Sequence, residues 1–234
     1  MEMVFEVSSV NFRIANSGIG EDFWSKEGRT DYRFEVSHEN KTIYAIGRPT
    51  SERKDWLDNL DFRITRTIKK LFSADEEDPN KPRQWFKDRK DIKVHTGFLR
   101  QYEAVQAKFL ALLEKYPDYD VLIWGFSLGA SWTQILLEDF IWWAYFKKKW
   151  PNRKVDGIFY GCGNPWRKLP KEIRKMVKKH STFVTNWWDP VTWMRLLRFY
   201  RYGKEIRIGK WYRFWPIQHK PDQMIRALDE RRVA

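Results

Sequence analysis

The stretch Asp120-Val-Leu-Ile-Trp-Gly-Phe-Ser127-Leu-Gly-Ala-Ser131 decides the fold predicted for this chain. It begins as a short apolar run typical of a buried strand, breaks at Gly125-Phe-Ser-Leu-Gly129, and continues with helical apolar spacing. A G-x-S-x-G pattern between a strand and a helix is typical of a nucleophilic serine on a sharp turn, with its hydroxyl projecting from the sheet. The helix N-terminus would direct backbone amides at a developing oxyanion. The simpler interpretation is a buried strand followed by a glycine turn without chemistry.

The composition favours a soluble chain with one domain over residues 1–234. This length suffices for a single large core, 32% of the residues are charged, and no apolar run reaches the roughly 18 residues of a membrane span. The N-terminal residues lack the basic and apolar blocks of a signal peptide, and the single cysteine excludes an internal disulfide. We therefore expect a cytoplasmic protein. Neither C-x-x-C nor H-E-x-x-H occurs, so no metal or other cofactor is predicted.

The charge and the tryptophan content are both unusual. The net charge is +13, and the chain contains 14 Trp residues. Such a mixture suits a nucleic acid, an anionic membrane surface or an acidic substrate. No zinc-finger spacing, RNP signature or basic region feeding heptads is present, so no nucleic-acid partner is expected. Lys and Arg are spread along the chain, which favours a general solvated surface. Binding to an anionic membrane surface is the alternative, and the oligomeric state is left open.

The rest of the chain alternates between strand and helix patterns. A β-hairpin is predicted over residues 31–46, with turn residues at 38–41. Helices are predicted over residues 98–116, 130–147 and 169–179, and strands over residues 121–124, 155–160, 182–187 and 204–208. This order predicts the α/β class: a mostly parallel central sheet with helices on both faces and an N-terminal β-hairpin.

Residues 63–94 form a candidate cap or lid. Apolar side chains at Ile64, Ile68 and Leu71 predict a short helix at its start. An acidic loop broken by prolines follows at residues 73–82, and then the apolar pair Trp85-Phe86. Loops of this kind often cover a site on a rigid scaffold, although a surface excursion without a role explains the pattern equally well.

Three polar residues follow predicted strands, where parallel sheets bind their ligands. These are Ser127, Asn164 and Asp189. A serine nucleophile needs an imidazole base and an acidic residue that orients it. Only Asp189 and His219 follow Ser127 in the order Ser, Asp, His with both partners in loops after strand-like segments. Ser127, Asp189 and His219 are therefore the predicted triad. Of the other histidines, His38 and His180 are expected to be solvated, and His95 is expected to cap or pack at the start of a helix.

Several ordered blocks of the sequence resemble the class 3 lipases, the α/β-hydrolase family of fungal triacylglycerol lipases. The blocks are Ile43–Thr50 with Asp55–Leu60, Val94–Tyr102, Tyr119–Ala130, Tyr160–Trp166 and Asn186–Thr192. His219 falls where the family has its catalytic base. The resemblance extends over most of the chain and implies the α/β-hydrolase fold.

The resemblance also implies a serine esterase or lipase without a cofactor, acting on lipid or other acyl esters. Ser127 would be the nucleophile, His219 the base and then the acid, and Asp189 the orienting carboxylate. Backbone amides of Leu128 and Thr50 would hold the oxyanion, and His95 would be structural.

Two residues depart from the family pattern. Phe126 replaces a His before the serine, and Pro49 replaces a Gly in the turn that presents Thr50. The alternative function is therefore a catalytically weak or inactive member of the fold that binds at an anionic membrane surface.

Overall fold

The computed structural model describes residues 25–27, 30–48, 64–66, 92–187, 189, 191, 199–209 and 221–232. Within these ranges, a seven-stranded sheet has the order β1-β2-β3-β6-β7-β9-β10. Its strands are β1 (Ser25–Glu27), β2 (Thr30–Ser37), β3 (Thr42–Gly47), β6 (Asp120–Phe126), β7 (Val155–Tyr160), β9 (Ser181–Asn186) and β10 (Lys204–Ile208).

The sheet combines an antiparallel N-terminal part with a parallel remainder. Strands β1, β2 and β3 pair antiparallel, and β3, β6, β7, β9 and β10 pair parallel. The hairpin predicted over residues 31–46 is the pair β2–β3, with Val36 opposite Ile43. Strand β6 lies in the middle of the sheet, and Val121, Leu122 and Ile123 are fully buried. A parallel strand is covered on both faces, which is why this stretch reads as a continuous apolar run.

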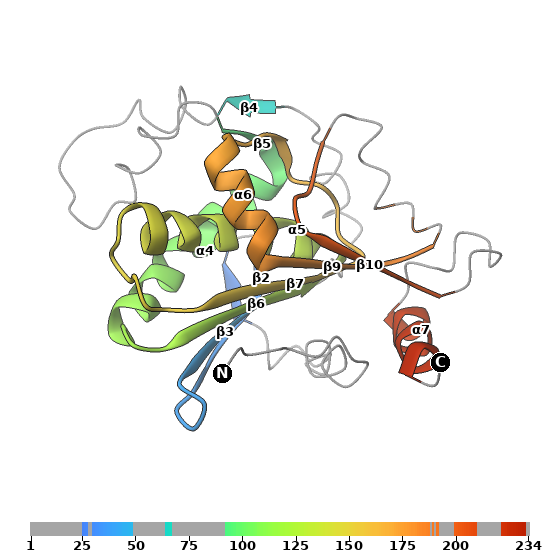
Figure 1. The fold of residues 1–234 in the computed structure, drawn as a ribbon, viewed down its shortest axis with the longest axis horizontal. Coiled ribbons are helices and arrows are strands. Elements are labelled where there is room, and N and C mark those ends of the chain that lie inside the picture. Colours follow the sequence, from blue (N-terminus) through green and yellow to red (C-terminus); the bar gives the residue numbers. More distant parts are fainter. Residues whose placement is uncertain are drawn as a thin grey trace.

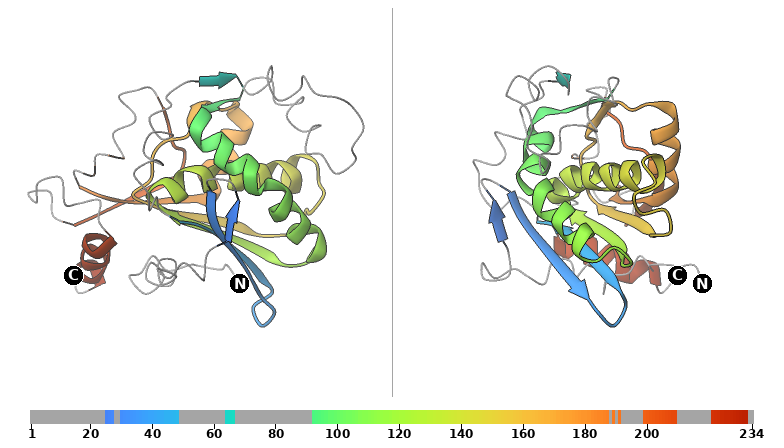
Figure 2. Two further views of the ribbon diagram at one scale, coloured as in Figure 1. Left: turned by 180° about the vertical axis from the view of Figure 1, so that it is seen from behind. Right: turned by 90° about the vertical axis from the view of Figure 1, so that its left-hand side faces the viewer.

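Helices cover both faces of the sheet. Helices α4 (Thr96–Lys115), α5 (Ser127–Ile141) and α6 (Lys171–His180) lie on one face, and α7 (Pro221–Arg232) lies on the other (Figures 1 and 2). A π-helical turn, Trp142–Phe146, extends α5. The predicted mostly parallel sheet with helices on both faces and an N-terminal hairpin is therefore confirmed. Helix α5 begins three residues earlier than predicted, at the serine itself.

Two apolar clusters separate the sheet from its helices. The larger lies under α4, α5 and α6, where Trp132 and Phe140 of α5 are almost fully buried. Each such side chain contributes about 1.5–3 kcal/mol of burial free energy. The smaller cluster joins the opposite face to α7 through Met224 and Leu228. The central position of α5 fixes its first residue, Ser127, relative to the sheet.

A second, three-stranded sheet has the order β4-β5-β8 within the described part of the chain. Its strands are β4 (Ile64–Arg66), β5 (Lys93–His95) and β8 (Trp166–Lys168). Residues 64–66 are thus extended and pair with β5, so the helix predicted from Ile64 is wrong at its start. Cross-strand hydrogen bonds to β5 outweigh the weak helical periodicity of so short a segment.

The candidate lid over residues 63–94 is described only at its ends, in β4 and at 92–94, and residues 67–91 lie outside the described ranges. The lid and the single domain over residues 1–234 stay predictions. Among the helices that the structure describes, none has the length and apolarity needed to cross a membrane.

Candidate active site

Ser127 lies at the junction between β6 and α5 in a strained backbone conformation. Its φ angle is +56°, whereas the preceding Phe126 is extended with φ −123° and ψ 142°. The left-handed region costs a non-glycine residue about 1–2 kcal/mol, so the surrounding packing must hold it there. The chain therefore turns sharply from strand to helix at the serine, as the G-x-S-x-G pattern predicts.

A close contact between β3 and the first turn of α5 shapes the surroundings of the serine. A Cβ atom added to Gly129 would lie 2.2 Å from the carbonyl oxygen of Gly47 and 2.5 Å from that of Arg48. Only glycine permits this approach, which brings the end of β3 against the turn. The Arg48 guanidinium pairs with the Asp31 carboxylate at 3.8 Å, and the Arg48 amide donates to the Asp31 carbonyl at 3.3 Å. The chain then continues toward Pro49 and Thr50.

The structure describes only one of the two residues predicted to hold the oxyanion. Leu128 is buried in the first turn of α5, where backbone N–H groups have no acceptor within the helix. Thr50 lies outside the described residues, two positions beyond Arg48. The Leu128 amide is thus positioned by the helix start, and the role of Thr50 stays a prediction.

The loop that follows β7 is hydrogen-bonded to the same helix start. The Ser131 hydroxyl donates to the Ser127 carbonyl at 3.0 Å and accepts from the Gly163 amide at 2.9 Å. The Gln134 side chain donates to the Gly163 carbonyl at 3.1 Å. These bonds join the serine turn to residues 161–165. Asn164, predicted at the strand end, lies in this loop and donates to the Phe199 carbonyl at 3.2 Å, so it binds backbone.

Asp189 lies just beyond the carboxyl end of β9, on the same edge of the sheet as Ser127. It is fully buried, and its Oδ1 accepts from the Val191 amide at 3.0 Å. Its own amide donates to the Asn186 carbonyl at 3.3 Å, which closes a tight turn after the strand. A buried, hydrogen-bonded carboxylate in a fixed orientation is what a triad requires to orient an imidazole.

The buried thiol of Cys162 interacts electrostatically with both Asp189 and Arg201. Burial raises the pKa of the Cys162 thiol to about 12, the Asp189 charge adds to this increase, and the Arg201 charge opposes it. The buried thiol is therefore neutral at ordinary pH and is not a competing nucleophile.

His219 lies outside the described residues, between β10 and α7. Beyond β10 the chain passes through Gly209, whose φ is +74°. Helix α7 begins at Pro221, two residues after His219, and shares an apolar cluster with Phe126 and Tyr160 from the carboxyl ends of β6 and β7. Both elements that flank the base are described, and the complete triad stays a prediction.

The other histidines have structural surroundings. His95 is fully buried, and its ring lies 4.2 Å from that of Phe98 and 5.2 Å from that of Phe199. His38 is exposed in the hairpin turn and forms a 2.9 Å hydrogen bond with the Tyr119 hydroxyl. His180 binds the Val155 carbonyl at 2.9 Å.

Two polar residues near the site were missed by the sequence interpretation. Ser131 lies one helical turn after Ser127, so its reach to the Ser127 carbonyl could have been inferred from spacing. Arg201 carried no local signal, because its contact with the Cys162 carbonyl depends on chain segments that are distant in sequence.

Comparison with known proteins identifies relatives of this arrangement. The family model Lipase (class 3) matches residues 44–198. The triacylglyceride lipase of Rhizomucor miehei is 20% identical, with a TM-score of 0.52, covering 76% of this chain and 62% of that one. The triacylglycerol lipase of Penicillium expansum is 21% identical, with a TM-score of 0.54, covering 86% and 76%. A lipase of Rhizopus microsporus var. chinensis is 18% identical, with a TM-score of 0.53, covering 85% and 68%.

These similarities confirm the α/β-hydrolase fold. The chain spans 52% to 62% of the length of the Rhizomucor miehei lipase chains that it matches. No curated protein sequence matches it.

Proposed function

This chain belongs to the class 3 lipase family, and we propose on that premise that it hydrolyses lipid-type carboxylic esters through an acyl-Ser127 intermediate. The observation that carries the proposal is the φ of +56° at Ser127, at the junction of a buried strand and a buried helix. Such a strained position persists only where the surrounding structure holds it, and it is typical of a nucleophile.

The proposed reaction follows the usual course of serine esterases. The Ser127 hydroxyl attacks the acyl carbon while His219 accepts its proton, and Asp189 orients the imidazole. The Leu128 and Thr50 amides stabilise the oxyanion, aided by the positive end of the α5 dipole. His219 then protonates the departing alcohol. In the second half of the reaction, His219 takes a proton from the water that attacks the acyl carbon and returns it to the Ser127 oxygen as the carboxylic acid departs. The full burial of Asp189 supports its part.

An exposed aromatic residue beside the proposed site supports a lipid-type substrate. Trp187 is 37% exposed and lies two residues before Asp189. An indole ring at the rim of a site offers apolar surface to an acyl chain and a polar N–H to water. We also retain the candidate lid over residues 63–94 as a proposal.

Basic and aromatic surface residues favour the alternative of a catalytically weak or inactive protein that binds at an anionic membrane. Phe146 is 37% exposed, its ring lies 5.3 Å from that of Trp142, and the Lys147 ammonium lies 5.4 Å from the centre of the Trp142 ring. Four exposed lysines follow one another along α6: Lys171, Lys175, Lys178 and Lys179. Co-sedimentation with liposomes containing or lacking anionic lipid tests this surface, and equal absence of binding to both would exclude it.

Turnover of a p-nitrophenyl ester series from acetate to palmitate tests the hydrolase. We expect wild-type turnover to disappear in Ser127→Ala and to fall in Asp189→Asn and His219→Ala. Ser37→Ala, a serine at the far end of β2, is the matched control and should retain wild-type turnover. The chain length with the highest kcat/KM separates an esterase from a lipase. Unchanged turnover in Ser127→Ala would reject the proposed nucleophile.

A further inference from the structure

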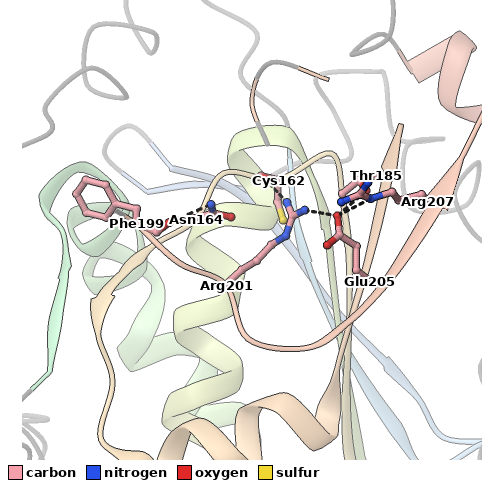
Figure 3. A network of polar contacts seen from close by, with 7 residues as sticks. All are labelled: Cys162, Asn164, Thr185, Phe199, Arg201, Glu205 and Arg207. Atoms are coloured by element: carbon pink, nitrogen blue, oxygen red, sulfur yellow. Dashed lines mark hydrogen bonds and ion pairs between the residues drawn. The ribbon is translucent and has the colours of Figure 1, made fainter. Parts of the chain in front are cut away.

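Residues 199–203 immediately precede β10 in the sequence and contact residues 162–166, which follow β7. At their upper end, Tyr200 and Trp166 exchange two backbone hydrogen bonds of 2.6 and 3.2 Å. At their lower end, β10 begins and returns beside β9 in parallel register. Figure 3 shows the side chain of Arg201 extending from this segment toward Cys162 and Glu205. The segment thus connects the residues that follow β7 to strand β10, which pairs with β9.

Arg201 carries a buried charge. Its side chain is 4% exposed, and its guanidinium lies 5.4 Å from the centre of the Phe183 ring. The guanidinium donates to the Glu205 carboxylate at 2.8 Å and to the Cys162 carbonyl at 3.4 Å. A buried ion pair pays a large desolvation cost and is weak evidence for stability.

On one side, Arg201 connects to the turn of the proposed nucleophile. The Cys162 carbonyl that it binds immediately precedes the Gly163 amide. That amide donates to the Ser131 hydroxyl at 2.9 Å, which in turn donates to the Ser127 carbonyl at 3.0 Å. Each contact is to backbone or to a side chain on the buried helix α5, so a shift of the Arg201 guanidinium would be transmitted to the Ser127 turn.

On the other side, Arg201 connects to the turn of Asp189. Its partner Glu205 accepts a second hydrogen bond, at 3.2 Å, from the Thr185 hydroxyl of β9. Thr185 immediately precedes Asn186, whose carbonyl accepts the Asp189 amide at 3.3 Å. A continuous series of contacts therefore runs from Ser127 through Arg201 to Asp189. The opposing effects of Arg201 and Asp189 on the Cys162 thiol place both charges near one sulfur atom.

We propose that Arg201 is a positioning residue for the ester hydrolysis: it fixes the Ser127 turn relative to the Asp189 turn. The inference rests on the proposed function, because it assigns Arg201 a part in the same reaction. Arg201 itself contacts no reacting atom.

The test compares Arg201→Met with wild type on a p-nitrophenyl ester. Loss of the link should lower kcat about 10- to 100-fold with KM unchanged, since misplacement by about 1 Å has this effect. Arg201→Lys keeps the positive charge but lacks the planar fork of donors that reaches both Glu205 and the Cys162 carbonyl, so it should restore only part of kcat.

Arg207→Gln is the matched control. Arg207 donates to the same Glu205 carboxylate at 3.4 Å, but its side chain is 51% exposed. Exposed ion pairs contribute little, so we expect kcat within about twofold of wild type. If Arg201→Met behaves like this control, the inference is overturned.

Arg201→Met leaves Glu205 without its main partner and could unfold the chain. The double variant Arg201→Met/Glu205→Gln removes both charges, which buried pairs often tolerate. Urea unfolding should show a folded protein, and its kcat should still be lowered. Wild-type kcat in this folded variant would reject the positioning role. Wild-type turnover that is lost in Ser127→Ala establishes the proposed function independently of Arg201. No turnover in wild type would overturn both.

Discussion

Gly129→Ala should disable the proposed site by separating β3 from α5. The added Cβ would lie 2.2 Å from the Gly47 carbonyl oxygen, whereas ordinary contacts begin at 3.4 Å, so the two backbones must move about 1.2 Å apart. Both neighbours are backbone atoms and cannot rotate away. Overpacking of this kind costs about 1–3 kcal/mol of unfolding free energy. Thr50, the proposed oxyanion donor, follows Gly47 by three positions in the sequence, and the loss of one such donor would lower kcat about 10²- to 10³-fold.

Gly157→Ala provides the control for the loss of stability. A Cβ there would lie 2.5 Å from the Phe159 ring and 2.9 Å from a Leu137 methyl group, which are the far ends of side chains that can rotate. Urea unfolding and p-nitrophenyl butyrate turnover, measured on both variants, separate the two effects. We expect both to unfold at lower urea but only Gly129→Ala to lose kcat. Wild-type kcat in a folded Gly129→Ala protein would refute the role of the β3–α5 contact in the site.

Three further predictions follow from the backbone and the buried titratable groups. In urea titrations, the free energy of unfolding of Ser127→Gly should exceed that of Ser127→Ala by about 1 kcal/mol, because only glycine adopts a φ of +56° without strain. Cys162 should react with a thiol reagent at pH 8 only in denaturant, because burial raises its pKa to about 12, and rapid labelling of the native chain would contradict this. Burial raises the pKa of Glu103 from 4.5 to about 7. Between these pH values the Glu103 carboxyl is ionised in the unfolded chain but protonated in the folded one, so the free energy of unfolding falls as pH rises from 4.5 to 7. Glu103→Gln should remove this decline and add on the order of 2 kcal/mol above pH 7 in urea titrations; an unchanged pH profile would reject the assignment.

The sequence was most informative where one local pattern is sufficient. The run Val121–Trp124 is apolar because a central parallel strand is buried on both faces, and β2 alternates because a hairpin strand has two unlike faces. The serine turn could also be predicted, because the two glycines and the serine occupy alternate positions, 125, 127 and 129, at the junction. The residues that determine these elements lie within a few positions of one another in the sequence.

Features made by distant contacts could not be predicted in the same way. Strands β4, β5 and β8 have three residues each and exist because they pair with one another, so their sequences show no period. For Ile64, a weak helical spacing predicted the wrong element. The Arg201–Glu205 pair was missed for a related reason: it becomes significant only when the loop after β7 and strand β9 are brought together.

Phe126 illustrates how a departure from the family pattern acts through packing. The family places a His before the nucleophile, whereas Phe126 is 5% exposed and shares an apolar cluster with Met224, Ala227 and Leu228 of α7. An imidazole in this cluster would need a polar partner or pay a desolvation cost. Because α7 begins two residues after His219, the apolar contacts of Phe126 help to fix the helix that follows the proposed base in the sequence. Phe126 therefore stabilises α7 through packing, whereas an imidazole at this position would need a polar partner.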